Sequence, residues 1–167
     1  NVRAGNNEDW YAAFVALGDR IKAIADEAAG KGHEVTASQA YRRAFTYYRS
    51  AERILAGTDK RKIPMYHRTI ECFHEGFGRS EHKYELLTIP FDGHELDAIF
   101  LPPRSDAKGT KPPCIIFPTG ADALPEENMF RGAQEMTARG AAVLLFNGPG
   151  QGSTIRLKGI PTIPDYE

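Results

Sequence analysis

A glycine-rich turn, Gly148-Pro-Gly-Gln-Gly152, follows a short apolar run and is one stretch of this chain whose residue types could do chemistry. Glycine-rich turns after a strand bind phosphate when several backbone N–H groups converge on the anion. This turn lacks the Gly-x-Gly-x-x-Gly order of dinucleotide sites and the Lys-Ser/Thr pair of a P-loop. Pro149 also removes one N–H donor. A structural turn is therefore predicted in preference to a nucleotide site, and no cofactor is expected.

A second group that could do chemistry consists of His67, Glu71 and His74, spaced i, i+4 and i+7. A helix would place the three side chains on one side, where they could ligate zinc. The same helix would bury Ile70 and Phe73, and histidine and glutamate at this spacing are common on helix surfaces. We therefore expect no metal site.

The turn at Gly148 ends the second of two similar stretches, residues 111–123 and 141–153. Each begins as an apolar run of strand length and stops in a Gly- or Pro-rich turn. Residues 124–140 between them have a helical composition. This order predicts a β-α-β unit. Parallel strands joined by a crossover helix are covered on both faces, which fits runs that are apolar throughout.

Three amphipathic helices are predicted in the first half of the chain. In residues 9–29 the apolar positions recur in steps of three and four, and a glycine ends the run. Thr36 and Gln39 have the spacing of a capping box, which predicts the start of a second helix. The third starts near Pro64 and ends before Gly78. The basic residues of the second helix, which also holds Glu52, predict a solvated or interdomain-paired face: Arg42, Arg43, Arg49 and Arg53.

The apolar pattern then changes from a helical to a strand period. Residues 84–90 and 95–101 flank Asp92-Gly93, which is a strong hairpin signal, so an antiparallel hairpin is predicted. The predicted fold class is α/β. Residues 1–80 form an N-terminal helical segment, and residues 81–167 form the hairpin followed by the β-α-β unit.

Length and composition exclude several classes of protein. The 167 residues carry a net charge of −1 at pH 7, which provides no basic surface for nucleic acid or an anionic membrane. No run approaches the roughly 18 apolar residues of a transmembrane helix. Cys72 and Cys114 are too few and too far apart for a disulfide framework, which favours a reducing compartment, the cytoplasm. Because the chain starts at Asn1 and ends at Glu167 soon after a strand-loop unit, we expect a piece of a longer product.

The order of hairpin, strand, helix and strand resembles the first half of an α/β-hydrolase sheet. Residues 147–153 resemble the Asp-x-x-Gly-x-Gly-x-Ser loop that follows the fourth strand of that fold. The preceding helical segment, with Ala40-Tyr-Arg-Arg-Ala-Phe-Thr-Tyr-Tyr-Arg-Ser-Ala-Glu52, is similar to the 2,6-dihydroxypseudooxynicotine hydrolase group. That group is related to the prolyl-oligopeptidase-like and dienelactone-hydrolase-like esterases. The resemblance covers about residues 10–167. It implies a Ser-His-Asp hydrolase that cleaves an ester, amide or C–C bond next to a carbonyl under an N-terminal helical cap.

The departure from the family is the absence of a Gly-x-Ser-x-Gly nucleophile elbow, which the family's acid and histidine would follow. The candidate serines lie on predicted helices, in a linker or one strand too early: Ser38, Ser50, Ser80 and Ser153. We therefore expect the nucleophile, histidine and acid outside these residues, and an inactive isolated chain. Ser153 is expected to be a loop-closing hydroxyl.

The family's strand order places the third strand between the fourth and the fifth. Without the fifth strand, residues 114–117 would form a sheet edge with bare apolar faces, which natural sheets avoid. The resemblance thus implies a partner, the C-terminal part of the same hydrolase, as a second chain or as further residues. The resemblance also allows a homodimer.

The match to the family's loop after the third strand implies site residues. Ala121 N–H is predicted to donate to the oxyanion, and Gly120 to let the backbone approach the substrate. The alternative is a tight strand-to-helix turn with no further role. The cap residues predicted to line the substrate pocket are Tyr47, Tyr48, Tyr66 and His74.

Aromatic phenols in the cap suit a flat aromatic or polyketide-like carbonyl substrate, which they would contact by stacking and hydrogen bonding. A second hypothesis comes from another class of protein. The chain would be a non-catalytic binding module, a decayed hydrolase half that pairs through its sheet edge with a partner chain.

Overall fold

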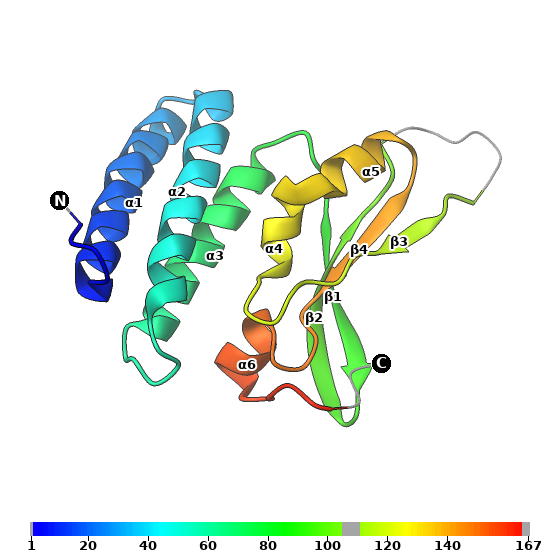
Figure 1. The fold of residues 1–167 in the computed structure, drawn as a ribbon. Coiled ribbons are helices and arrows are strands. Elements are labelled where there is room, and N and C mark those ends of the chain that lie inside the picture. Colours follow the sequence, from blue (N-terminus) through cyan, green and yellow to red (C-terminus); the bar gives the residue numbers. More distant parts are fainter. Residues whose placement is uncertain (1, 105–110, 165–167) are drawn as a thin grey trace. The chain divides into compact units, whose positions relative to one another are not determined.

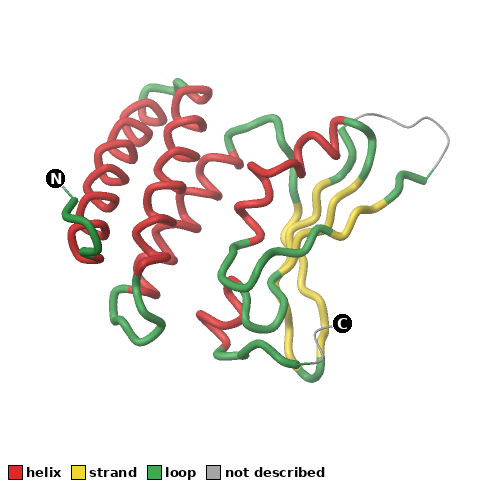
Figure 2. Tube along the Cα trace, in the orientation of Figure 1, coloured by secondary structure: helices red, strands yellow, loops and turns green. Residues whose placement is uncertain are grey.

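The computed structural model describes residues 2–104 and 111–164. The chain forms two compact units, Asn1–Glu81, which is helical, and His82–Glu167, which contains the sheet (Figure 1 and Figure 2). The predicted fold class, a helical segment followed by a mixed sheet with helices, is confirmed.

Three helices make up the first unit: α1 (Asn7–Gly30), α2 (Glu34–Ile54) and α3 (Lys62–Gly78). α2 packs against both of its neighbours (Figure 1). Phe45 of α2 meets Phe73 of α3 with ring centroids 6.0 Å apart, and both rings are buried. Six alanines are also buried in the unit: Ala25, Ala28, Ala37, Ala40, Ala44 and Ala51. No helix in residues 2–104 or 111–164 is both long and apolar enough to cross a membrane.

The helix starts differ in how they are capped. Asn6 caps α1, because its side-chain oxygen accepts a hydrogen bond from Asp9 N at 2.9 Å. The capping box predicted at Thr36 was wrong, since α2 begins two residues earlier, at Glu34. The Ala37 N–H already bonds the His33 carbonyl at 2.9 Å, so Thr36 lies inside the first turn and cannot act as its cap.

A buried ion cluster joins α2 to the start of α3. The Glu52 carboxylate is fully buried; Arg49 Nη1 lies 2.5 Å from one of its oxygens and Lys62 Nζ lies 3.0 Å from the other. Lys62 Nζ also donates to the backbone carbonyls of Glu52 and Leu55, each at 3.0 Å. Arg49 is 4% exposed, so the solvated alternative predicted for the basic face is wrong at this residue.

The second unit begins with the predicted hairpin. β1 (Glu85–Phe91) and β2 (His94–Leu101) pair antiparallel around Asp92 and Gly93, whose φ angles are 44° and 73°. Positive φ at both turn residues matches the right-handed twist of the strands, and glycine adopts it without a steric penalty. The hairpin prediction is confirmed.

A parallel pair completes the sheet. β3 (Cys114–Ile116) runs parallel to β4 (Ala142–Phe146), β2 runs antiparallel to β4, and the strand order is β1-β2-β4-β3. The predicted β-α-β unit is therefore present. β4 is its core strand, with Val143 and Leu145 fully buried.

The predicted helix over residues 124–140 is broken into three parts. These are α4 (Pro125–Asn128), the wide turn η1 (Met129–Ala133) and α5 (Gln134–Ala138). Gly132 has φ 130°, which no helix contains, so the backbone kinks there. α4 and α5 both contact β4, and α6 (Gly152–Lys158) contacts β2.

β3 is an open edge of the sheet, as predicted (Figure 1). Its Ile115 and Ile116 side chains are 37% and 64% exposed. The expectation that both parallel strands are covered on both faces thus holds for β4 and fails for β3. Cys114–Ile116 contain no charged residue or proline of the kind that protects natural sheet edges.

The two cysteines differ in environment and are predicted to differ in reactivity. Cys114 on β3 is exposed, whereas Cys72 on α3 is buried, and burial raises the pKa of its thiol to about 12. At pH 8 we expect a disulfide-exchange reagent to label one thiol of the native chain rapidly and the second only after unfolding. The Cys114→Ser variant should lose the rapid phase. Rapid labelling that survives this substitution would contradict the assignment.

Candidate active site

Two loops meet at the carboxyl ends of the parallel strands, where ligands bind in open α/β sheets. The 118–121 loop follows β3, and the 147–151 loop follows β4 and leads into α6. Phe117 N donates to the Leu144 carbonyl at 3.0 Å, so the backbone pairing extends to the start of the first loop. The two loops are thereby held at the same edge of the sheet.

The Gln151 side chain connects these loops. It is 4% exposed, and its Nε2 donates to the Thr119 carbonyl at 2.6 Å and to the Gly120 carbonyl at 3.4 Å. Its Oε1 accepts from Gly148 N at 3.1 Å. The sequence does not predict this role, although the glutamine lies inside the motif Gly148-Pro-Gly-Gln-Gly152.

Gly120 and Ala121, the predicted oxyanion-hole residues, lie in the first loop and are exposed. The Gly120 carbonyl accepts a turn hydrogen bond from Ala123 N at 3.0 Å. Within residues 2–104 and 111–164, neither the Gly120 nor the Ala121 N–H donates a hydrogen bond. Two neighbouring backbone donors are therefore available to an incoming oxygen atom.

Ser153 is buried beneath the second loop and lies in the first turn of α6, whereas the sequence predicts it in the loop. Its hydroxyl donates to Asp97 Oδ2 at 2.5 Å, and Lys158 Nζ donates to Asp97 Oδ1 at 2.8 Å. Burial would raise the pKa of the Asp97 carboxyl, but the hydrogen bonds from Lys158 and Ser153 outweigh it and hold the pKa below its usual value. A serine that donates to a carboxylate and is 4% exposed has the geometry of a structural hydroxyl.

The other candidate serines bond to backbone carbonyls inside the helical unit. The hydroxyl of Ser38 donates to Gly76, that of Ser50 to Thr46 and that of Ser80 to Phe77, at 2.7–2.9 Å. These bonds are typical of structural serines in helices and helix ends. A fifth serine, Ser105, lies outside the described residues.

The four predicted substrate-lining residues all belong to the helical unit, with Tyr47 and Tyr48 on α2 and Tyr66 and His74 on α3. Tyr47 is half-buried, with its ring 6.3 Å from that of Phe14. Tyr66 is 4% exposed. His74 is half-buried against the Phe73 ring, and burial lowers the pKa of its imidazole.

Tyr48 is fully buried and is committed to contacts within the helical unit. Its hydroxyl lies 2.8 Å from Asp19 Oδ1, and Arg68 Nη2 donates to it at 2.7 Å. Burial and the hydrogen bond to Asp19 raise the pKa of the Tyr48 phenol. The Tyr48 hydroxyl therefore links all three helices through two hydrogen bonds.

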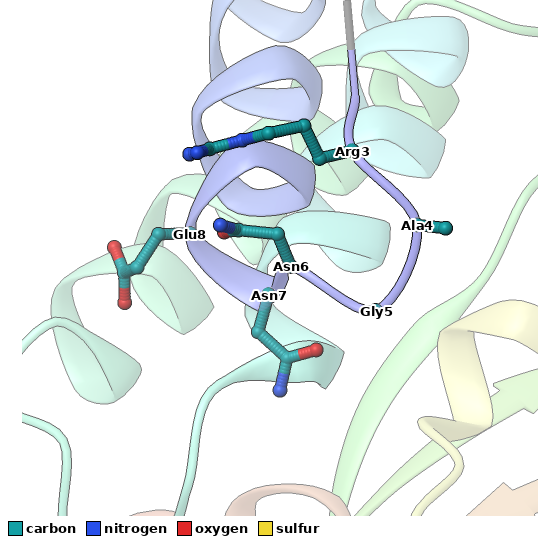
Figure 3. A pocket seen from close by; sticks show the side chains of 6 residues that line it. All are labelled: Arg3, Ala4, Gly5, Asn6, Asn7 and Glu8. Carbon is teal, nitrogen blue, oxygen red and sulfur yellow. The ribbon is translucent and has the colours of Figure 1, made fainter.

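Neither a metal-binding cluster nor the hollow at the N-terminal end provides a second candidate site within the described part of the chain. Among the residues that the structure describes, no group of three His, Cys, Asp or Glu side chains could hold a metal ion. An open hollow of about 500 Å³ at the N-terminal end is lined by consecutive residues (Figure 3), Arg3, Ala4, Gly5, Asn6, Asn7 and Glu8. Arg3 is bonded to Asp9, and the hollow brings together no nucleophile and base.

The comparisons with known proteins agree with this architecture. No protein-family model matches the chain. The α/β hydrolase ucsC of Acremonium sp is 34% identical over 180 residues, which cover 100% of this chain and 37% of that protein. The α/β hydrolase xenA of Xenoacremonium sinensis is 34% identical over 168 residues, covering 99% of this chain and 40% of xenA. The chain therefore spans about two fifths of the length of the curated relatives it matches.

Solved structures show the same fold. The 2,6-dihydroxy-pseudo-oxynicotine hydrolase superposes with a TM-score of 0.71 at 22% identity, over 87% of this chain and 40% of that chain. AbyA5 superposes with a TM-score of 0.59 at 16% identity, over 89% and 39%. The chain thus has a partial α/β-hydrolase fold behind a helical segment. In sequence it is a homologue of fungal α/β hydrolases, as the predicted resemblance implies.

Proposed function

We propose that this chain is part of a serine-type α/β-hydrolase that cleaves an ester, amide or C–C bond next to a carbonyl. The chain supplies the helical cap and the oxyanion-hole loop. The C-terminal part of the same hydrolase, as further residues or a second chain, supplies the nucleophile, the histidine and the acid. The homology to α/β hydrolases over the whole chain supports the reaction class.

The observation that carries the proposal is the open edge at β3 beside the loop with two available N–H donors. A neighbouring strand would pair with the open backbone of β3, and its side chains would lie beside those of Ile115 and Ile116. A nucleophile carried at the end of that strand would lie beside Gly120 and Ala121. Thr119 Oγ1 is buried and has no hydrogen-bond partner among the described residues, which supports a completing segment at the same place.

Aromatic side chains of the helical unit support a proposal for the substrate class. Tyr47 and His74 are half-buried, so part of each ring is accessible. Aromatic rings of this kind stack on flat apolar groups, and their polar atoms can form hydrogen bonds to the same ligand. We therefore propose an aromatic or polyketide-like carbonyl compound as substrate. Tyr48 and Tyr66 would act indirectly, by fixing the helices that carry the accessible rings.

A fluorophosphonate probe, which labels activated serines, tests the assignment of roles. The protein recovered from its natural source is labelled, denatured and sequenced by mass spectrometry. We expect the label on a serine in a Gly-x-Ser-x-Gly sequence outside residues 1–167, and no ester turnover by the isolated 167 residues. Turnover by the isolated chain that Ser153→Ala abolishes would overturn the proposal. A recovered complex that has no reactive serine would do so too, in favour of a binding module.

A further inference from the structure

The Gln151 amide is buried between two loops, and the proposed function leaves it without a role. The orientation of the amide follows from its partners. Gly148 N–H faces Oε1 at 3.1 Å, so the NH₂ group faces the opposite side, toward the carbonyl oxygens of Thr119 and Gly120. The distance of 2.6 Å to the Thr119 oxygen is at the short end for an N–H···O bond, and burial shields it from competing water.

These two carbonyls share their peptide planes with the donors at the candidate site. The Thr119 C=O lies in one plane with the Gly120 N–H, and the Gly120 C=O lies in one plane with the Ala121 N–H. In a trans peptide the C=O and N–H bonds point in opposite directions. Holding both carbonyls against Gln151 therefore turns both N–H groups away from it, toward the exposed side of the loop.

The amide is carried by a turn that is itself held in place. Gln151 N donates to the Gly148 carbonyl at 3.0 Å, and Gly150 N donates to the Ile160 carbonyl at 3.1 Å. Ser153 N donates to Asn147 Oδ1 at 3.3 Å in the first turn of α6. The position of the side chain is thus set by the segment after β4, which pairs with β2 and β3.

We propose that Gln151 is a positioning residue of the oxyanion hole, which orients the Gly120 and Ala121 N–H groups toward the substrate's carbonyl oxygen. This inference rests on the proposed function. Glutamine suits the role because one end of the group accepts from Gly148 while the other donates to two carbonyls. A carboxylate would keep the acceptor and place a negative oxygen against both carbonyls.

The test is the pH dependence of Gln151→Glu in the complete hydrolase, assayed with a short acyl ester. At pH 8 we expect kcat to fall about 100-fold with little change in KM, because the donors act mainly in the transition state. Burial beside two carbonyl oxygens raises the pKa of the new carboxyl above the usual value of about 4.3. Its protonated form can donate, so the ratio of variant to wild-type kcat should rise about tenfold or more between pH 8 and pH 5.

Two further variants test whether the pH dependence of kcat comes from the titrating carboxyl at position 151. Gln151→Met has similar length and no titrating group, so its kcat ratio should be low at every pH. Gln134→Glu is the matched control, because Gln134 Nε2 donates to the Met129 carbonyl at 2.7 Å in the same unit, away from the loop. Its ratio should stay near one. A flat ratio for Gln151→Glu, or an unchanged kcat at pH 8, overturns this inference alone. An inactive wild type overturns the proposed function and this inference together.

Discussion

Replacing Glu52 with alanine is expected to lower the free energy of unfolding of the helical unit by about 3–5 kcal/mol. Glu52 is fully buried, and its carboxylate balances Arg49 at 2.5 Å and Lys62 at 3.0 Å. Without the Glu52 carboxylate, the cationic side chains of Arg49 and Lys62 stay buried but lose the negative charge that both of them contact. Removing one partner of a buried ion cluster costs more than the intact cluster contributes, since the desolvation of the remaining charges is no longer offset.

Trp10 provides the measurement, because it is the only tryptophan of the chain and lies on α1. Its Nε1 donates to the Ser50 carbonyl of α2 at 3.1 Å, so its fluorescence reports on the packing of these helices. Urea unfolding followed at this residue should show the full loss for Glu52→Ala. Glu27→Ala is the control, since the Glu27–Lys31 pair is exposed on both sides, and it should leave the midpoint nearly unchanged. Equal midpoints for both variants would show that the buried cluster contributes no more than a surface pair.

Replacing Gly152 with alanine should destabilise the second unit by roughly 3 kcal/mol, from about 1 kcal/mol of backbone strain and about 2 kcal/mol of overlap. Gly152 has φ 41°, and a Cβ there would lie 1.5 Å from Asn147 Oδ1. This oxygen accepts the Ser153 N–H, so it cannot move without losing a hydrogen bond at the start of α6. The loop after β4 should open, and with it the contact from Gln151 to the first loop.

Gly159→Ala is the matched control for Gly152→Ala. Gly159 also has a positive φ, of 68°, but no atom lies within 4 Å of its would-be Cβ, so only the backbone cost of about 1 kcal/mol applies. Hydrogen exchange of peptides that cover β4 measures the opening of this unit. Exchange should accelerate far more in Gly152→Ala than in Gly159→Ala. Similar rates in the two variants would mean that the close contact with Asn147 relaxes at no cost.

Local patterns in the sequence were sufficient for most of the architecture. The Asp92-Gly93 signal predicts the hairpin because both residues adopt positive φ, a requirement of the turn alone. The helical periods of the first half and the apolar runs around residues 114 and 142 depend on neighbours three or four residues apart, or on a single continuous run. The homology to α/β hydrolases was also visible in the order of these elements.

Local patterns failed at three places in the chain. Thr36 and Gln39 have the spacing of a cap, but the chain enters α2 from the end of α1 and starts the helix at Glu34. Residues 124–140 have a helical composition, and one glycine in such a run is usually tolerated, yet the backbone kinks at Gly132. Arg49 and Glu52 form a polar pair typical of a solvated helix face, yet both side chains are buried, and Lys62 from the start of α3 pairs with Glu52.

The candidate site shows the same division. The sequence by itself determined which loops follow the parallel strands, because strand, turn and helix signals are short-range, and it placed Gly120 and Ala121 in the first of them. Only the tertiary structure decided that Gln151 reaches the carbonyls of Thr119 and Gly120, 32 and 31 residues away in the chain. It likewise decided that Ser153 is buried against Asp97, 56 residues away. Hydrogen bonds over such separations depend on how β2, β3 and β4 pair, and no local pattern encodes that pairing.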